Sequence, residues 1–195
     1  MRKIQTGSDE RKKKKRNQFI VGVVLILVMV LSTFVIVMDS LGGSEKIQDK
    51  INYNGFIFNL KNNLWQLEIG DYKFSFYNNP AQVENLTSYV STNLSKLNNY
   101  VSQPLYISSQ DYTSNSEIYT ALSPFVERVQ LACHSNESCT GDYPIKNCDN
   151  NFIIISESNQ TSIYQQDKCV FISGPKQELI KLTDLFLFKI LGIKE

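Results

Sequence analysis

The 195-residue chain has a single histidine, His134, and contains none of the short motifs that mark the commonest catalytic sites. It has no Gly-rich phosphate loop, no H-E-x-x-H, no G-x-S-x-G and no C-x-x-C. These absences argue against a P-loop enzyme, a zincin protease, an α/β-hydrolase and a thioredoxin-like oxidoreductase. We therefore predict no catalytic residue, no metal and no cofactor.

Charge is absent from Phe19 to Met38, which read FIVGVVLILVMVLSTFVIVM. A helix needs about 20 apolar residues to cross a bilayer core of roughly 30 Å. The basic run RKKKKR at residues 11–16 precedes the stretch, and the first charge after it is Asp39. Residues 1–16 carry eight of the 20 basic residues and two of the 19 acidic ones. The positive-inside rule then places the N-terminus in the cytoplasm and the remainder outside.

Two other interpretations of this region are less favourable. A cleaved signal peptide has a shorter apolar region, of about 7–15 residues, that ends in small residues, whereas Val35 to Ser40 (VIVMDS) offers no good cleavage site. A basic run is also found in nucleic-acid-binding patches, but orientation and anionic lipid already explain one beside a membrane span. We therefore expect the lipid bilayer and an unknown envelope or membrane protein as partners, and no nucleic acid.

The resulting organisation has four parts. We predict a basic cytoplasmic tail over residues 1–18, a transmembrane signal anchor over 19–38 and a linker over 39–50 that contains Gly42-Gly43-Ser44. An extracytoplasmic domain, long enough for a core of its own, follows over 51–195.

Alternating and helical patterns predict the fold of the outer domain. Apolar residues at every second position over 56–76, with polar turns at Asn62-Asn63 and Gly70-Asp71, predict a three-stranded meander. Asn79-Pro80 then opens an amphipathic pattern that predicts a helix of about 18–20 residues, as far as Val101.

The second half of the domain predicts a crossover and another meander. A strand at 105–107, a helix over 118–132 interrupted at Ser123-Pro124, and a buried strand at 152–155 indicate one βαβ unit. Strands at 153–155, 162–164 and 169–172 suggest a second meander, and the apolar segment after Gly174 suggests a buried C-terminal helix. The predicted fold class is α+β (mixed α/β), preceded by one transmembrane helix.

All four cysteines lie on the side of the anchor that the charge rule places outside, in an oxidising compartment. Four cysteines allow three disulfide connectivities. We favour Cys133–Cys139 with Cys148–Cys169, because the second bond would join two strands that begin at the same sheet edge. The alternative is a zinc site with His134, but gaps of five, eight and twenty residues do not match C-x₂₋₄-C pairs.

Other polar residues carry weaker signals. Four N-x-S/T sequons, at Asn85, Asn93, Asn136 and Asn159, permit glycosylation. They do not indicate it, because the domain is so rich in Asn, Ser and Thr that about three sequons are expected by chance. The scattered acids Asp111, Glu117, Asp142 and Asp149 are explained by solvation or helix capping.

The loop SSQDYTSNS at residues 108–116 follows one predicted strand and precedes a helix. In a βαβ unit this is the carboxyl edge of the sheet, where ligands often bind. Ser108, Ser109, Asp111 and Ser116 are therefore candidate ligand-edge residues, although a polar cap and turn is the simpler interpretation.

Several phrases of the sequence, taken as a set, resemble those of a group of membrane proteins: Tyr53-Asn-Gly-Phe-Ile-Phe, Leu64-Trp-Gln-Leu, Phe76-Tyr-Asn-Asn-Pro, Pro144-Ile-Lys-Asn-Cys, Cys169-Val-Phe-Ile and Leu185-Phe-Leu-Phe-Lys-Ile-Leu-Gly-Ile. Over most of residues 51–193 the chain resembles uncharacterised single-pass membrane proteins of small-genome archaea. The resemblance implies the same topology and transfers no activity or site.

We therefore expect a membrane-anchored domain that acts by binding or assembly in the cell envelope, without catalysis. One alternative is an envelope enzyme of the hydrolase type, with a site near residues 108–117 and 134–149. Another is an accessory subunit of a membrane complex, in which Ser32 and Thr33 contribute to helix contacts. A deep pocket with convergent carboxylates or a shifted acid would favour the enzyme, and an apolar surface patch would favour binding.

Overall fold

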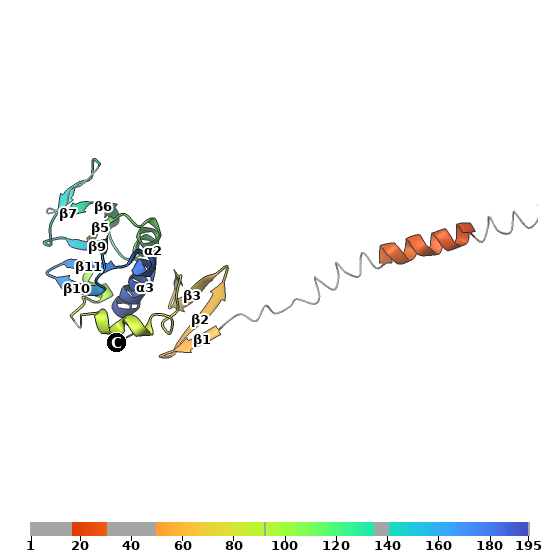
Figure 1. The fold of residues 1–195 in the computed structure, drawn as a ribbon, viewed down its shortest axis with the longest axis horizontal. Coiled ribbons are helices and arrows are strands. Elements are labelled where there is room, and N and C mark those ends of the chain that lie inside the picture. The colour runs from red at the N-terminus through yellow and green to blue at the C-terminus, as the bar shows by residue number, and fades with distance from the viewer. Residues whose placement is uncertain (1–16, 31–49, 92, 135–140, 195) are drawn as a thin grey trace, which may run out of the picture. The chain divides into compact units, whose positions relative to one another are not determined.

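The computed structural model describes residues 17–30, 50–91, 93–134 and 141–194 (Figure 1). The chain divides into two compact units, Met1–Ile47 and Gln48–Glu195. In the first unit, residues 17–30 form an α-helix whose apolar side chains are exposed. No helix within the described residues is long and apolar enough to cross a membrane. Residues 31–38 of the predicted anchor lie outside the described part of the chain.

The second unit begins with a four-stranded antiparallel meander of β1 (Lys50–Tyr53), β2 (Phe56–Lys61), β3 (Leu64–Ile69) and β4 (Tyr72–Phe76). The turn residues Asn62 and Asn63 both have positive φ, as two-residue hairpin turns that match strand twist require. The predicted meander is confirmed. The sequence missed β1, which begins in the last residue of the predicted linker.

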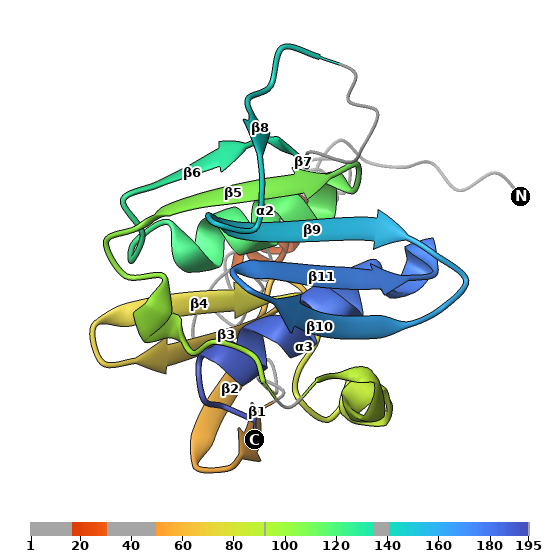
Figure 2. The same ribbon diagram turned by 90° about the vertical axis from the view of Figure 1, so that its left-hand side faces the viewer.

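A five-stranded sheet forms the other side of the unit (Figure 2). Its order is β10 (Ser162–Gln166), β11 (Cys169–Gly174), β9 (Asn151–Glu157), β5 (Pro104–Ser109), β6 (Arg128–Leu131). β10 alone is antiparallel to its neighbour; the other four strands are parallel.

The prediction of a second meander is therefore wrong in its strand order. β11 lies between β10 and β9, with Cys169 opposite Phe152. The physical reason is burial: Phe152 to Ile155 are covered on both faces, which requires a central position for β9.

Two α-helices lie between the two sheets, α2 (Tyr112–Leu122) and α3 (Leu179–Ile190) (Figure 1). On one side of α3, the ring of Phe188 lies 4.8 Å from that of Phe76 and 5.9 Å from that of Phe58 in the meander. On its other side α3 packs against β11 and β9. The buried C-terminal helix is confirmed, and its apolar circumference is explained by a sheet on each side.

The amphipathic helix predicted as far as Val101 is wrong. The segment instead holds two short 3₁₀ helices, η1 (Glu84–Tyr89) and η2 (Leu97–Asn99), and Val90 forms a bridge to Ile163 of β10. Asn, Ser and Thr, which are frequent here, compete with the helix by bonding to nearby backbone groups.

The helix predicted over 118–132 is also too long, because α2 ends at Leu122 and Val129 belongs to β6. Pro124 lacks the N–H that a continuing helix requires and restricts the residue before it. The crossover therefore runs from β5 through α2 to its parallel neighbour β6, whereas β9 lies on the other side of β5.

A small third layer covers the other face of the large sheet. β7 (Cys133–His134) and β8 (Ile145–Lys146) pair in parallel beside a second apolar cluster of Tyr106, Ala132, Phe152, Ile154 and Cys169. Successive residues of a strand point to opposite faces, so Tyr106 faces this cluster while Leu105 and Ile107 face the helices.

Candidate functional site

A shallow groove of about 380 Å³ lies where the segment before β5 meets the amino ends of β9 and β11. Five of its lining side chains are carboxamides. Its residues are Ser95, Asn98, Asn99, Val101, Gln103, Asn151, Gln165, Asp167 and Lys168.

Gln165 and Asn151 fix the groove to the edge of the sheet. The Gln165 side chain accepts a hydrogen bond from Ser95 N at 2.7 Å and donates to Ser95 Oγ at 2.8 Å and to Asp167 O at 2.7 Å. Asn151 Nδ2 donates to the carbonyl of Asn99 at 3.2 Å. These bonds attach the 95–99 segment, which contains the short helix η2, to the edge of the sheet.

Other carboxamides of the groove are available to a ligand. Asn98 and Gln103 are exposed, and their side chains make no hydrogen bond within the described part of the chain. Each amide offers both a donor and an acceptor. The one acid and the one base of the groove, Asp167 and Lys168, balance each other in formal charge. The groove therefore suits a neutral, polar ligand.

A pair of buried carboxyl groups lies at the interface of α2 and α3. Glu117 on α2 is 4 % exposed and Asp184 on α3 is 0 % exposed. Glu117 Oε1 accepts from Tyr77 N at 3.1 Å, and Asp184 Oδ2 accepts from N and Nδ2 of Asn78, both at 2.8 Å. The pair thus binds the chain that leaves β4.

Burial and mutual repulsion determine the protonation of this pair. Burial, followed by the adjacent Asp184 carboxyl, raises the pKa of Glu117, and the Tyr77 N–H opposes this only in part. Burial also raises the pKa of Asp184, against the opposing hydrogen bonds from Glu117 and Asn78. Two carboxyl groups in one site cannot both ionise readily, so Glu117 holds a proton and Asp184, with more donors, carries the charge.

The sequence placed Glu117 among solvated or capping acids, and this was wrong. Its neighbour Ile118 is wholly buried, and Asp184 stands within α3, most of whose residues are apolar and buried. An acid in an otherwise apolar helix is the signal that identifies such a buried group. The pair meets the carboxylate criterion for an enzyme, but neither residue lines the groove described above. Because the pair lies buried between two helices, we interpret its role as structural.

The loop after β5 has the cap-and-turn structure. Asp111 is the N-cap of α2, and its Oδ2 accepts from Ser114 N at 2.8 Å. Ser109 Oγ accepts from Asp111 N at 3.0 Å. Asp111 and Ser109 are therefore used within the loop, Ser108 is half-buried, and Ser116 is exposed on α2. The structure does not bring the four into contact with the amide-lined groove.

The disulfide Cys148–Cys169 is present and joins the chain entering β9 to the start of β11. The two strands are adjacent and parallel, so they begin at the same edge, although not through the predicted meander. Cys139 and Asn136 lie outside the described residues; of the other sequons, Asn85, Asn93 and Asn159 are exposed.

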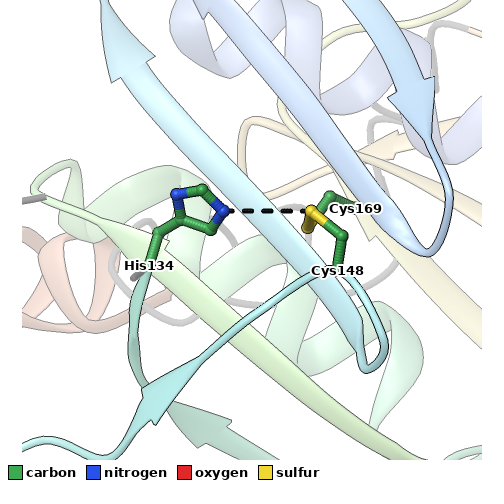
Figure 3. Close-up of side chains that lie close together, drawn as sticks. All are labelled: His134, Cys148 and Cys169. Carbon is green, nitrogen blue, oxygen red and sulfur yellow. Dashed lines mark hydrogen bonds between the residues drawn. A yellow bond between two sulfur atoms is a disulfide. The ribbon is translucent and has the colours of Figure 1, made fainter. Parts of the chain in front are cut away.

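His134 completes a cluster with the disulfide (Figure 3). Its Nε2 lies 3.8 Å from Cys148 Sγ. The imidazole also lies beside the rings of Phe152 and Phe171, at centroid distances of 5.9 and 6.0 Å.

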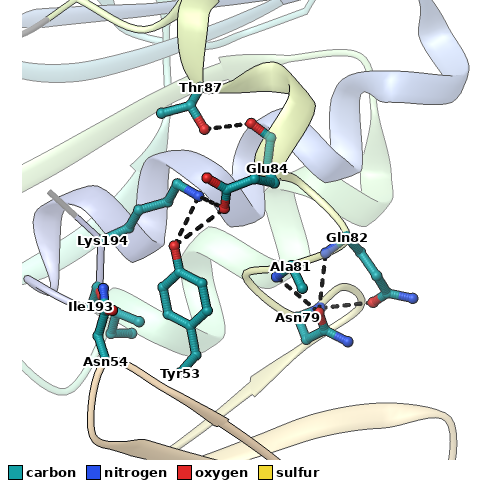
Figure 4. Close-up of polar contacts among 9 residues, drawn as sticks. All are labelled: Tyr53, Asn54, Asn79, Ala81, Gln82, Glu84, Thr87, Ile193 and Lys194. Carbon is teal, nitrogen blue, oxygen red and sulfur yellow. Dashed lines mark hydrogen bonds and ion pairs between the residues drawn. The ribbon is translucent and has the colours of Figure 1, made fainter.

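The C-terminal residues are tied to the first hairpin (Figure 4). Lys194 is 4 % exposed and its Nζ donates to Tyr53 Oη at 3.0 Å and to Glu84 Oε2. Burial disfavours the ammonium, but these hydrogen bonds outweigh it and raise the pKa of Lys194. The hydrogen bond from Lys194 lowers the pKa of Glu84. Asn54 Nδ2 adds a bond to the carbonyl of Ile193 at 3.2 Å.

In comparisons with protein-family models, curated proteins and solved structures, nothing matches this chain.

Proposed function

We propose that the chain is a membrane-anchored, extracytoplasmic binding domain of the cell envelope whose amide-lined groove takes a neutral, hydroxyl-rich ligand such as an envelope glycan. The observation that carries the proposal is the set of five carboxamides in one groove, of which Asn98 and Gln103 are available to a ligand. A carboxamide places a donor and an acceptor side by side, which matches two neighbouring hydroxyl groups of a sugar.

The shape of the groove supports binding without catalysis. It is open to solvent, so a ligand longer than the groove is not excluded by its walls, and Val101 adds an exposed apolar contact. The carboxyl pair that an enzyme would use is enclosed between α2 and α3. General acid–base catalysis needs a group within hydrogen-bond reach of the substrate.

The anchor is supported by the sequence and by the exposed helix of the first unit. The apolar side chains from Phe19 to Val30 are exposed, and the uncharged sequence continues to Met38. An apolar surface of this extent is stable in lipid. The basic tail before it agrees with a cytoplasmic N-terminus and an outer domain.

NMR titration of the full chain in detergent micelles tests the groove. The probes are chitotetraose and maltotetraose, and the signals are the side-chain amides of Asn98 and Gln103. We expect saturable shifts at these amides with at least one probe. The double variant Asn98→Ala/Gln103→Ala should weaken binding at least about tenfold, the effect of losing roughly 1.4 kcal/mol of hydrogen bonding.

Gln177→Ala is the matched control, because Gln177 is an exposed carboxamide in η3 (Lys176–Glu178), outside the groove. Its affinity should equal that of the wild type. If neither oligosaccharide shifts the groove amides, or if the double variant binds as well as Gln177→Ala does, the groove does not bind such ligands.

Membrane fractionation tests the anchor separately. We expect the full chain to stay in the membrane pellet after alkaline carbonate extraction and to be released when residues 19–38 are deleted. A mature N-terminus near Ser40 would show instead that the segment is a cleaved signal peptide.

A further inference from the structure

The cluster of His134, Cys148 and Cys169 brings together three side chains that bind thiophilic metals. They come from three separate segments: β7, the chain entering β9, and the start of β11. Their ligand atoms all lie within 4.8 Å of one another. Figure 3 shows the imidazole directed at the sulfur atoms. We propose that the disulfide is the oxidised form of a zinc-type site, in which both thiolates and His134 Nε2 bind the ion after reduction.

The distances agree with tetrahedral coordination. With Zn–S of about 2.3 Å and Zn–N of about 2.0 Å, a tetrahedral site separates nitrogen from sulfur by about 3.5 Å and the two sulfurs by about 3.8 Å. His134 Nε2 already lies 3.8 Å from Cys148 Sγ. The Cα atoms of Cys148, in the turn before β9, and Cys169, at the start of β11, are 4.8 Å apart, which leaves both thiolates free to bind one ion after reduction.

The surroundings match a neutral complex. Zn²⁺ with two thiolates and a neutral imidazole has no net charge, so it avoids the large desolvation penalty of an ion. Phe152 and Phe171 flank the imidazole, and Cys169 is fully buried, so most of the shell is apolar. Cys148 is half-buried, which gives a reductant access to one sulfur. Three protein ligands leave a fourth position for water or another ligand.

The conversion is a two-electron exchange with a dithiol. A thiolate of the dithiol attacks Cys148 Sγ and breaks the bond to Cys169 Sγ, and its second thiol then displaces Cys148 and closes a cyclic disulfide. The dithiol is oxidised, and both cysteines become thiols. Binding of the metal ion then releases two protons, one from each thiol, as the thiolates coordinate it.

Cobalt absorption tests the proposal on the full chain in detergent. The starting protein is Cys133→Ser/Cys139→Ser, in which Cys148 and Cys169 are the only cysteines left. After reduction with a dithiol and its removal under anaerobic conditions, we expect Co²⁺ to give the visible bands of a tetrahedral site and a near-ultraviolet thiolate-to-cobalt band. Zn²⁺ should bleach both bands. The oxidised protein should give neither.

Variants in this background separate ligands from neighbours. His134→Ala should weaken Co²⁺ binding at least about tenfold, because it removes a direct ligand of the ion. Replacing a residue that only supports a ligand already lowers metal affinity by about 10–100-fold. Lys146→Ala is the matched control, since Lys146 pairs with His134 in the β7–β8 ladder but is no metal ligand at neutral pH. It should leave the spectrum unchanged.

Three results would overturn the proposal. One is a reduced protein that keeps its circular dichroism and shows no tetrahedral cobalt bands. Another is equal cobalt affinity of the His134→Ala and Lys146→Ala variants. The third is a reduced protein that loses its fold in the presence of Zn²⁺, because the proposal requires the fold to hold the three ligands together.

Discussion

At the scale of single residues, the Glu117–Asp184 pair makes the stability of the domain depend on pH. The folded state keeps a proton on Glu117 that the unfolded chain releases above its ordinary pKa of 4.5. The folded state therefore binds more protons than the unfolded state over this range, and stability falls as the pH rises. Below the unfolded pKa the contribution is fully present.

Replacing Glu117 with glutamine should remove this dependence. We expect the free energy of unfolding of the wild type to fall between about pH 7 and about pH 9, above the raised pKa of Asp184 of about 6. That of Glu117→Gln should stay nearly constant over this range, because the amide does not titrate. Urea denaturation at a series of pH values measures this. Glu117→Ala, which leaves the Tyr77 N–H without its acceptor, should be less stable than wild type by about 1–3 kcal/mol. A wild type whose stability rises over that pH range would contradict the assignment of the proton.

The Lys194 contacts form the second test at this scale. Lys194→Met keeps the apolar stem and removes the bonds to Tyr53 and Glu84. We expect a loss of about 1 kcal/mol in the free energy of unfolding, because the Glu84 side chain is 61 % exposed and its attraction is screened by water. Thermal or urea unfolding measures it, and Lys181→Met, at an exposed position of α3, serves as the control. Equal effects of the two variants would show that the buried ammonium of Lys194 does not contribute to the stability of the fold.

At the scale of elements, α3 is the helix that both sheets share. Phe188→Ala should lower the free energy of unfolding by about 3–5 kcal/mol, because it removes ring contacts with Phe58 and Phe76 and leaves a cavity. Tyr119→Ala, on the exposed side of α2, should change it by less than about 0.5 kcal/mol. Chemical denaturation compares the two. Similar losses of stability in the two variants would mean that α3 is not packed tightly between the sheets.

The Cys148–Cys169 disulfide joins two strands across 21 residues. A disulfide that closes a loop of that length restricts the unfolded chain and so stabilises the folded state by about 3 kcal/mol. Cys148→Ala/Cys169→Ala should therefore lose about 3 kcal/mol under non-reducing conditions without metal. Denaturation measures the loss, and a loss below about 1 kcal/mol would show that β9 and β11 hold their register without the bridge.

At the scale of the whole molecule, the proposed anchor leads us to expect that the basic N-terminal residues orient the domain. Replacing residues 11–16 with serine and glutamine should increase the fraction of chains with the domain in the cytoplasm, because the orienting positive charge is lost. Protease protection of sealed vesicles measures the fraction. Replacing Lys176 and Lys181 within the domain is the control and should not change it. An unchanged orientation after the first replacement would require another determinant.

Residues 48–195 form a compact unit by themselves. A chain limited to these residues should unfold in one cooperative step, with the same midpoint as the domain of the full chain. Differential scanning calorimetry compares the two. A lower midpoint for the short chain would show that the first 47 residues stabilise the domain.

The sequence by itself determined the features that depend on local pattern. Alternation and Asn-rich turns specified the first meander, and the apolar segment after Gly174 specified a buried helix. These signals are local because turn geometry and side-chain period act over a few residues. The candidate groove gave no such signal, since its five carboxamides are ordinary residues spread over residues 98–165.

The tertiary structure alone decided which strands are neighbours and which polar groups meet. β11 lies between β10 and β9 because β9 must be covered on both faces, and 3₁₀ turns replace the helix predicted as far as Val101 because Val90 pairs with the sheet. Glu117 and Asp184 meet because α2 and α3 pack side by side between two sheets, 67 residues apart in the chain. Contacts between distant segments are fixed by the burial of whole faces, and no short stretch of sequence contains that information.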